Sequence, residues 1–120
     1  RQLLAESLGK NGRGPTPLAS TAADLHSMLQ LYIDGPKDKF TTFLTDTTDS
    51  ASAFTQSVTS LYQEKQLPYG LITFEERDAD TIGAVAMLTM LQVVLLARLL
   101  EVSAFDQPAV ESYKEKIQNS

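Results

Sequence analysis

The sequence predicts an α/β fold in which a parallel sheet is flanked by helices. Two short segments, residues 39–45 and 71–74, have the Thr-rich, aromatic or apolar composition of strands. A helical pattern lies between them, because Phe54, Val58 and Leu61 recur at the spacing of one helix face. A strand, a helix and a second strand at this spacing favour a right-handed crossover, and therefore two parallel strands.

A capped helix is predicted ahead of the first strand. Thr21 and Asp24 match the capping-box pattern, and apolar residues then recur at helical spacing over residues 22–33 until a Gly-Pro pair ends the pattern. Residues 9–17 precede this helix and contain three glycines and two prolines. Such a segment cannot propagate a helix or a central strand, so a loop is predicted there.

A long apolar helix is predicted after the second strand. Asp80 or Thr81 is placed to cap it, and the pattern extends to about Glu101. Because the pattern is apolar almost all round, we expect the helix to be covered on most sides. Its most apolar stretch, residues 82–97, is shorter than the roughly 20 apolar residues of a membrane span, so a buried helix is predicted. A last short helix begins near Gln107.

Bulk composition limits the possible functions. The length of 120 residues suits one domain, and the net charge of −5 provides no basic field for nucleic acid or for an anionic membrane. The absence of cysteine excludes disulfides, thiol catalysis and cysteine-based zinc sites, and it is compatible with the cytosol. A single histidine, His26, cannot form an imidazole cluster for a metal. No nucleic-acid partner, membrane or metal is therefore expected.

Three side chains are candidates for chemistry, and each also has an ordinary structural explanation. Glu6 lies just before the glycine-rich loop, either as the partner of Lys10 in a solvated ion pair or as a partly desolvated general base. Taken alone, His26 fits a histidine at the rim of an apolar helix face, and Lys114 fits the solvated face of a charged helix. The loop has neither the dinucleotide fingerprint nor the P-loop spacing, so no nucleotide is predicted.

Three segments resemble, in the same order, segments of bacterial glucose-6-phosphate isomerases. They are AESLGK at residues 5–10, DLHSMLQLY at 24–32 and FDQPAVE at 105–111. The resemblance extends over nearly the whole chain. It implies a partial three-layer sandwich of the sugar-isomerase (SIS) type, with residues 1–120 as a C-terminal SIS domain fragment that includes the C-terminal helix. A missing N-terminal domain would also cover the exposed edges of a two-stranded sheet.

The resemblance also implies roles for particular residues. By motif, Glu6 is the base that moves a proton between C2 and C1 as glucose 6-phosphate and fructose 6-phosphate interconvert through an enediolate. His26 and Lys114 are implied to assist opening of the sugar ring, and Gln2 is implied to contact the substrate near its phosphate. No cofactor or metal is implied. The implied setting is cytoplasmic glycolysis and gluconeogenesis.

The same resemblance predicts that this chain is not a complete enzyme. Family members are homodimers in which the histidine corresponding to His26 reaches the active site from the neighbouring subunit. Their phosphate-binding loops, and an arginine that stabilises the enediolate, lie in the earlier part of the enzyme and have no match here. We therefore expect the isolated chain to be inactive.

Two other functions remain open at this stage. The first is a sugar-phosphate-binding or regulatory module that keeps the SIS fold without turnover. The presence of Glu6, His26 and Lys114 together argues against it, because binding alone does not need a base. The second is another sugar isomerase, such as an aminosugar-phosphate isomerase or a fusion with a transaldolase. The segments around His26 and Phe105 argue against that alternative.

Overall fold

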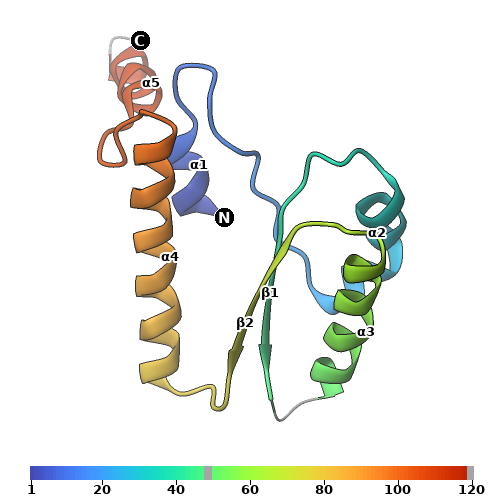
Figure 1. Cartoon of the computed structure of the whole chain (residues 1–120). Coiled ribbons are helices and arrows are strands. Elements are labelled where there is room, and N and C mark those ends of the chain that lie inside the picture. Colours follow the sequence, from blue (N-terminus) through green and yellow to red (C-terminus); the bar gives the residue numbers. More distant parts are fainter. Residues whose placement is uncertain (48–49, 119–120) are drawn as a thin grey trace. The chain divides into compact units, whose positions relative to one another are not determined.

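The computed structural model describes residues 1–47 and 50–118 and confirms the α/β class. Residues 20–83 form one compact unit, and residues 1–19 form a second unit together with the chain from residue 84 onward. Five helices and two strands occur in the described residues: α1 Gln2–Leu8, α2 Ala22–Asp34, β1 Thr41–Asp46, α3 Ser50–Glu64, β2 Tyr69–Phe74, α4 Ala79–Leu99 and α5 Pro108–Gln118 (Figure 1).

The two strands are parallel, as the sequence predicts. They pair from Thr41 opposite Tyr69 to Asp46 opposite Phe74, and α3 forms the connection between them. β1 begins two residues and ends one residue later than predicted, and β2 begins two residues earlier, because strand ends depend on hydrogen bonds to a partner that composition does not show. The predicted strand, helix and strand are otherwise confirmed.

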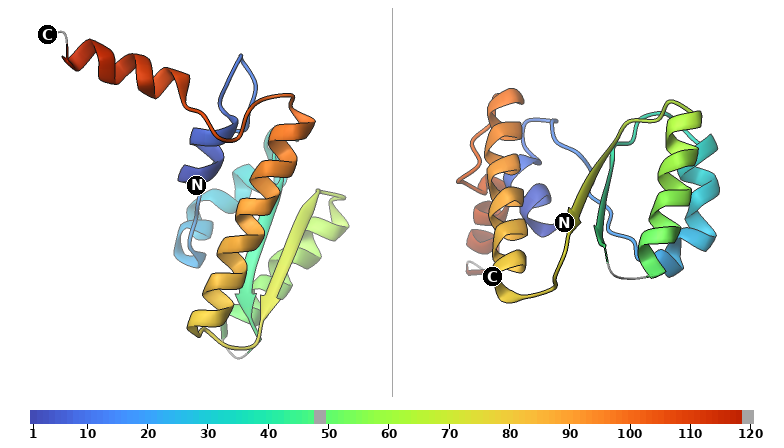
Figure 2. Two further views of the ribbon diagram at one scale, coloured as in Figure 1. Left: turned by 90° about the vertical axis from the view of Figure 1, so that its left-hand side faces the viewer. Right: turned by 60° about the horizontal axis from the view of Figure 1, so that its bottom comes forward.

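Helices α2 and α3 share a core with one face of the sheet. The buried side chains Ile33, Val58 and Tyr62 come from the two helices. Phe43 of β1 and Tyr69 of β2 pack against Tyr62 edge to face, with ring centroids 5.3 and 5.9 Å away. Figure 2 shows both helices beside the strands in this unit. The helical periodicity of α3 therefore predicted the inward positions of Phe54 and Val58, whereas Leu61 is 38% exposed.

The opposite face of the sheet is exposed. On this face Leu44 of β1 is 57% exposed, and its register partner Ile72 of β2 is only partly buried. Within the described residues the sheet has only these two strands, so each strand also has a free edge. One helix-covered face, and a second face that carries the apolar pair Leu44 and Ile72, are consistent with part of a three-layer sandwich.

Helix α2 begins with the predicted capping box. The Asp24 carboxylate accepts a hydrogen bond from the Thr21 backbone N–H at 2.7 Å, and the Thr21 hydroxyl accepts one from the Asp24 backbone N–H at 3.4 Å. The hydrogen bond from the Thr21 backbone lowers the pKa of Asp24 below its ordinary value. Two backbone donors at this helix end are therefore satisfied.

The second unit has a small core between α1 and α4. Leu8 of α1 is fully buried against Val93 and Ala97 of α4. Four partly buried apolar residues surround these three: Leu4, Leu100, Val102 and Ala104. This core holds α1, and with it the side chains that α1 carries, on the last turns of α4.

Helix α4 differs from its prediction at two points. Its N-terminal cap is Asp78, whose carboxylate accepts from the Thr81 N–H at 2.8 Å, so neither Asp80 nor Thr81 is the capping residue. Most of its apolar surface is also uncovered in this chain, with Ile82 65% and Leu95 64% exposed. The expectation of cover on most sides was therefore wrong for this chain, because an apolar pattern shows that cover is needed but not which segment supplies it.

By length and composition alone, α4 also meets the criterion for a membrane-crossing helix. It has 21 residues with a mean hydropathy of 2.0 in its most apolar part. Helices in the cores of soluble proteins meet the same criterion, so this single helix is weak evidence for a membrane segment.

Candidate active site

The carboxylate of Glu6 is held by two amide side chains. Gln2 lies one turn earlier on α1, and its Nε2 donates to Glu6 Oε1 at 2.7 Å. Gln107, which directly precedes α5, donates from Nε2 to Glu6 Oε2 at 3.2 Å. Glu6 and Gln107 are both half-buried. Each carboxylate oxygen therefore has a neutral hydrogen-bond donor, and the two donors come from opposite ends of the chain.

A tight turn follows α1 and confirms the predicted loop. The backbone N–H groups of Lys10 and Arg13 donate to each other's carbonyls at 3.2 and 2.8 Å. Asn11 and Gly12 stand between them with φ values of 54° and 71°, the left-handed conformation that an Asn-Gly turn favours. The glycine-rich sequence therefore reverses the chain sharply.

Gly14 is required by the backbone close to this turn. Its φ is 106°, and an added Cβ would lie 2.4 Å from the backbone oxygen of Leu8. No residue with a side chain fits this position without moving the backbone. The close approach places the loop against the end of α1.

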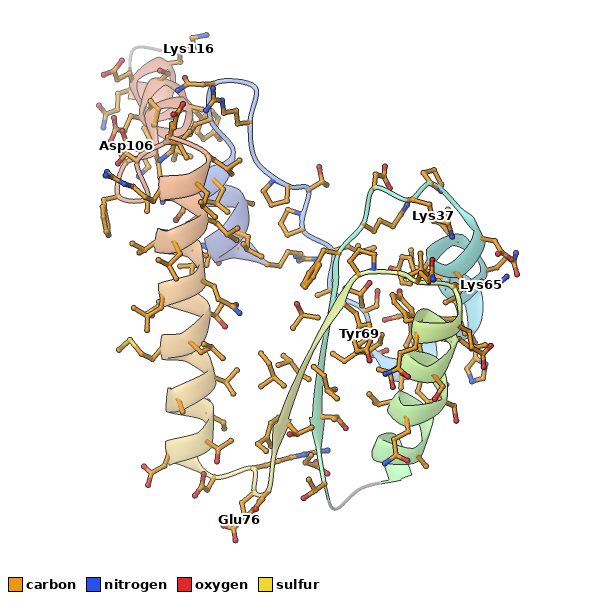
Figure 3. All side chains as sticks on the ribbon, in the orientation of Figure 1. Lys37, Lys65, Tyr69, Glu76, Asp106 and Lys116 are labelled. Atoms are coloured by element: carbon orange, nitrogen blue, oxygen red, sulfur yellow. The ribbon has the colours of Figure 1, made fainter. Side chains whose placement is uncertain are left out.

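The loop is tied to the segment between α4 and α5 through two basic side chains. The Lys10 ammonium donates to the carbonyl of Ser103 and pairs with the Asp106 carboxylate at 2.5 Å. Arg13 donates to the carbonyl of Leu100 at 2.5 Å. Asp106 lies on the connection into α5 (Figure 3). These contacts hold the residues just before Gln107 next to the loop that follows Glu6.

The pairing of Lys10 argues against one of the two explanations of Glu6. Lys10 binds Asp106 and not Glu6, so the solvated ion pair four residues along the chain is not formed. The hydrogen bond from Lys10 lowers the pKa of Asp106 below its ordinary value. Glu6 is instead a half-buried carboxylate with amide partners, which leaves it able to accept a proton and fixed in orientation.

The remaining predicted residues lie elsewhere. Lys114 is exposed on α5, and among the described residues it makes no hydrogen bond or ion pair with Glu6. His26 is exposed on α2 and belongs to the other compact unit. The structure thus brings Gln2 and Glu6 together, adds Gln107 to them, and leaves the roles of His26 and Lys114 as predictions.

Sequence reasoning did not select Gln107 as a functional residue. In the sequence, Gln107 belongs to the FDQP segment that carries the family resemblance, and it lies near the start of a predicted helix. A glutamine before a proline has no feature of its own that indicates a carboxylate partner 101 residues away. Within residues 1–47 and 50–118, no group of three or more acidic or histidine side chains is arranged to hold a metal ion.

The fold and the site define an α/β protein in which a half-buried carboxylate is held by two amide side chains. Comparison with known proteins gives the particular family. Glucose-6-phosphate isomerase of Methanocaldococcus jannaschii is 36% identical over a match that covers 96% of this chain and 34% of that protein. The probable glucose-6-phosphate isomerase of Methanococcus maripaludis is 37% identical, with 97% and 31% covered.

A shorter match has a higher identity. Glucose-6-phosphate isomerase of Rubrobacter xylanophilus is 59% identical over 39 residues, which are 32% of this chain. No family model matches. The chain spans about a third of the length of the first two curated relatives. It is therefore similar to one part of glucose-6-phosphate isomerases, which confirms the resemblance predicted from its three segments.

Proposed function

We propose that this chain is the C-terminal part of a glucose-6-phosphate isomerase, with Glu6 as the base that transfers the proton. The observation that supports the proposal best is the half-buried Glu6 carboxylate, held through both oxygens by Gln2 and Gln107. It occurs in a chain that is similar to these enzymes over nearly its whole length. An oriented carboxylate is the group that proton abstraction next to a carbonyl requires.

The proposed reaction is an internal transfer of hydrogen. In the open-chain aldose, a Glu6 oxygen takes the proton from C2, the C2–H electron pair forms a C1–C2 double bond, and the carbonyl electrons move to O1. The proton of the 2-hydroxyl then passes to O1 as O2 forms a carbonyl, and the electron pair of the C1–C2 double bond takes the proton from Glu6 at C1. One carbon is oxidised and its neighbour is reduced, so no external oxidant is needed.

His26 and Lys114 are proposed to act in opening the sugar ring. One group must protonate the ring oxygen while another takes the proton of the 1-hydroxyl, and imidazole and ammonium groups suit these tasks. Both side chains are exposed in this chain and therefore accessible to a substrate. Gln2 is proposed to contact the substrate near its phosphate in addition to its bond to Glu6.

The proposed partners are the rest of the same polypeptide and a second copy of it. The exposed Leu44 on the sheet face away from α2 and α3, and the exposed apolar side of α4, support a need for further protein surface. In the proposed homodimer, His26 enters the active site of the neighbouring subunit. The phosphate-binding loops would come from an N-terminal domain, and the enzyme would act in the cytoplasm in glycolysis and gluconeogenesis.

The test is a coupled assay that measures conversion of fructose 6-phosphate to glucose 6-phosphate by the full-length protein. Glu6→Gln keeps the shape of the side chain but removes the base, and we expect the rate to fall by about 10² to 10⁴. Glu64→Gln, the same change at an exposed position of α3, is the matched control and should leave the rate unchanged.

Each outcome has a distinct meaning. An active parent protein whose rate survives Glu6→Gln would remove Glu6 from the role of base. A parent protein that binds fructose 6-phosphate without converting it would favour the non-catalytic SIS module. The isolated 120-residue chain should be inactive, and appreciable turnover by it would contradict the proposal that the phosphate site lies outside it.

A further inference from the structure

Gln107 differs from Gln2 in what its bond to Glu6 achieves. Gln2 and Glu6 are four residues apart on the same short helix, so they move together and their bond sets only the local rotamer. Gln107 belongs to the segment before α5, and its bond joins Glu6 to a different part of the unit. Only this second bond fixes the carboxylate relative to its surroundings.

The backbone at Gln107 is well supported. Its carbonyl accepts hydrogen bonds from the N–H groups of Val110 and Glu111 at 3.0 Å each, as the first turn of α5 closes. Pro108 follows it and restricts the backbone at the start of the helix. The amide of Gln107 therefore extends toward Glu6 from a backbone that is fixed on its C-terminal side.

The N-terminal side of this segment is held as well. Lys10 binds the Ser103 carbonyl and the Asp106 carboxylate, and its side chain is only 7% exposed. Both ends of the short segment that carries Gln107 are thus anchored, one to the loop after Glu6 and the other to α5. Side chains that must hold a reacting group in place require this kind of support.

We propose that Gln107 is a positioning residue for proton transfer by Glu6. This inference rests on the proposed function of Glu6 as the base. A carboxylate has about four lone-pair sites, of which the two amides occupy one on each oxygen. One site on each oxygen stays free to take a proton, while rotation of the carboxylate about its Cγ–Cδ bond is restricted. The same carboxylate can then remove the proton at C2 and return it at C1.

The proposal predicts a particular kinetic change. Without the Gln107 amide, the carboxylate still binds a proton but is less often aligned with both carbons. We expect kcat to fall by about 10- to 100-fold, while KM changes by less than about threefold. The proton should also be lost to water more often, because its return to C1 becomes slower while exchange with solvent does not.

The experiment uses the full-length protein and glucose 6-phosphate deuterated at C2. Gln107→Met removes both amide groups at similar side-chain length, and Gln56→Met on the exposed surface of α3 is the matched control. The measurements are kcat, KM and the fraction of deuterium retained at C1 of fructose 6-phosphate. We expect lower kcat and lower retention for Gln107→Met, with both values unchanged for Gln56→Met.

Retention separates positioning from a merely structural role. A variant that is partly unfolded has fewer active molecules but the same retention in those that work. An unchanged kcat, or a reduced kcat with unchanged retention, would therefore overturn the proposal. If Gln107→Met does not fold, Gln107→Asn keeps the amide one methylene shorter and should give the same two changes. A parent protein without isomerase activity would refute the proposed function itself.

Discussion

Leu8 should be the most sensitive position for stability in the unit that carries Glu6. It is fully buried and contacts Val93 and Ala97, the other two buried residues of that core. Removing three carbons from a buried leucine costs about 2.7 to 5.0 kcal/mol, depending on how well the cavity closes. Because this core is small and most of α4 is exposed, water and neighbouring side chains can partly fill the cavity that Leu8→Ala leaves. We therefore expect Leu8→Ala to cost about 3 kcal/mol.

Amide hydrogen exchange in the last turns of α4 measures this loss directly. A change of about 3 kcal/mol corresponds to exchange that is about 100-fold faster, at 1.36 kcal/mol for each factor of ten. Amides in α3 belong to the other compact unit and should keep their rates. Leu3→Ala on the same helix is the control, because Leu3 is 36% exposed and should cost less than about 1 kcal/mol. Equal effects of the two substitutions would refute the assignment of Leu8 to the core.

Three further predictions concern the loop and a helix cap. Asp106→Asn should lower the melting temperature at neutral pH, because Lys10 lowers the pKa of Asp106 and the pair stabilises the folded state above the ordinary Asp pKa. This difference should shrink as the pH falls below about 3.9 and the carboxylate is protonated; a difference that persists would contradict the ion pair. Gly14→Ala should cost more than about 1 kcal/mol in urea unfolding, because its Cβ would meet the Leu8 carbonyl. Gly12→Ala shares the strain of a positive φ but has nothing within 4 Å, so it should cost less than Gly14→Ala. Thr21→Val should cost about 1 kcal/mol and increase exchange at the start of α2, since it removes half of the capping box, and unchanged exchange would show that the cap is not formed in solution.

The candidate site was only partly predictable. Gln2 and Glu6 lie four residues apart, and helix geometry alone brings such residues to one face. The same rule also allowed an ion pair between Glu6 and Lys10, which is not formed because the helix ends at Leu8 and Lys10 binds Asp106 instead. Periodicity applies only while the helix continues, so it could not predict the partner of a residue beyond its end.

The sequence by itself determined the local structure of this chain. Helical spacing at Phe54 and Val58, and the capping box at Thr21, depend on contacts between neighbours in the chain, so they can be recognised without a structure. Tertiary structure alone decided two other features: the contact of Gln107 with Glu6, and the exposure of most of α4. The first depends on how a turn and two basic side chains bring distant segments together. The exposure of α4 depends on which protein surface is present to cover it. An apolar sequence shows that a helix is favoured in a buried position, but not which segment buries it.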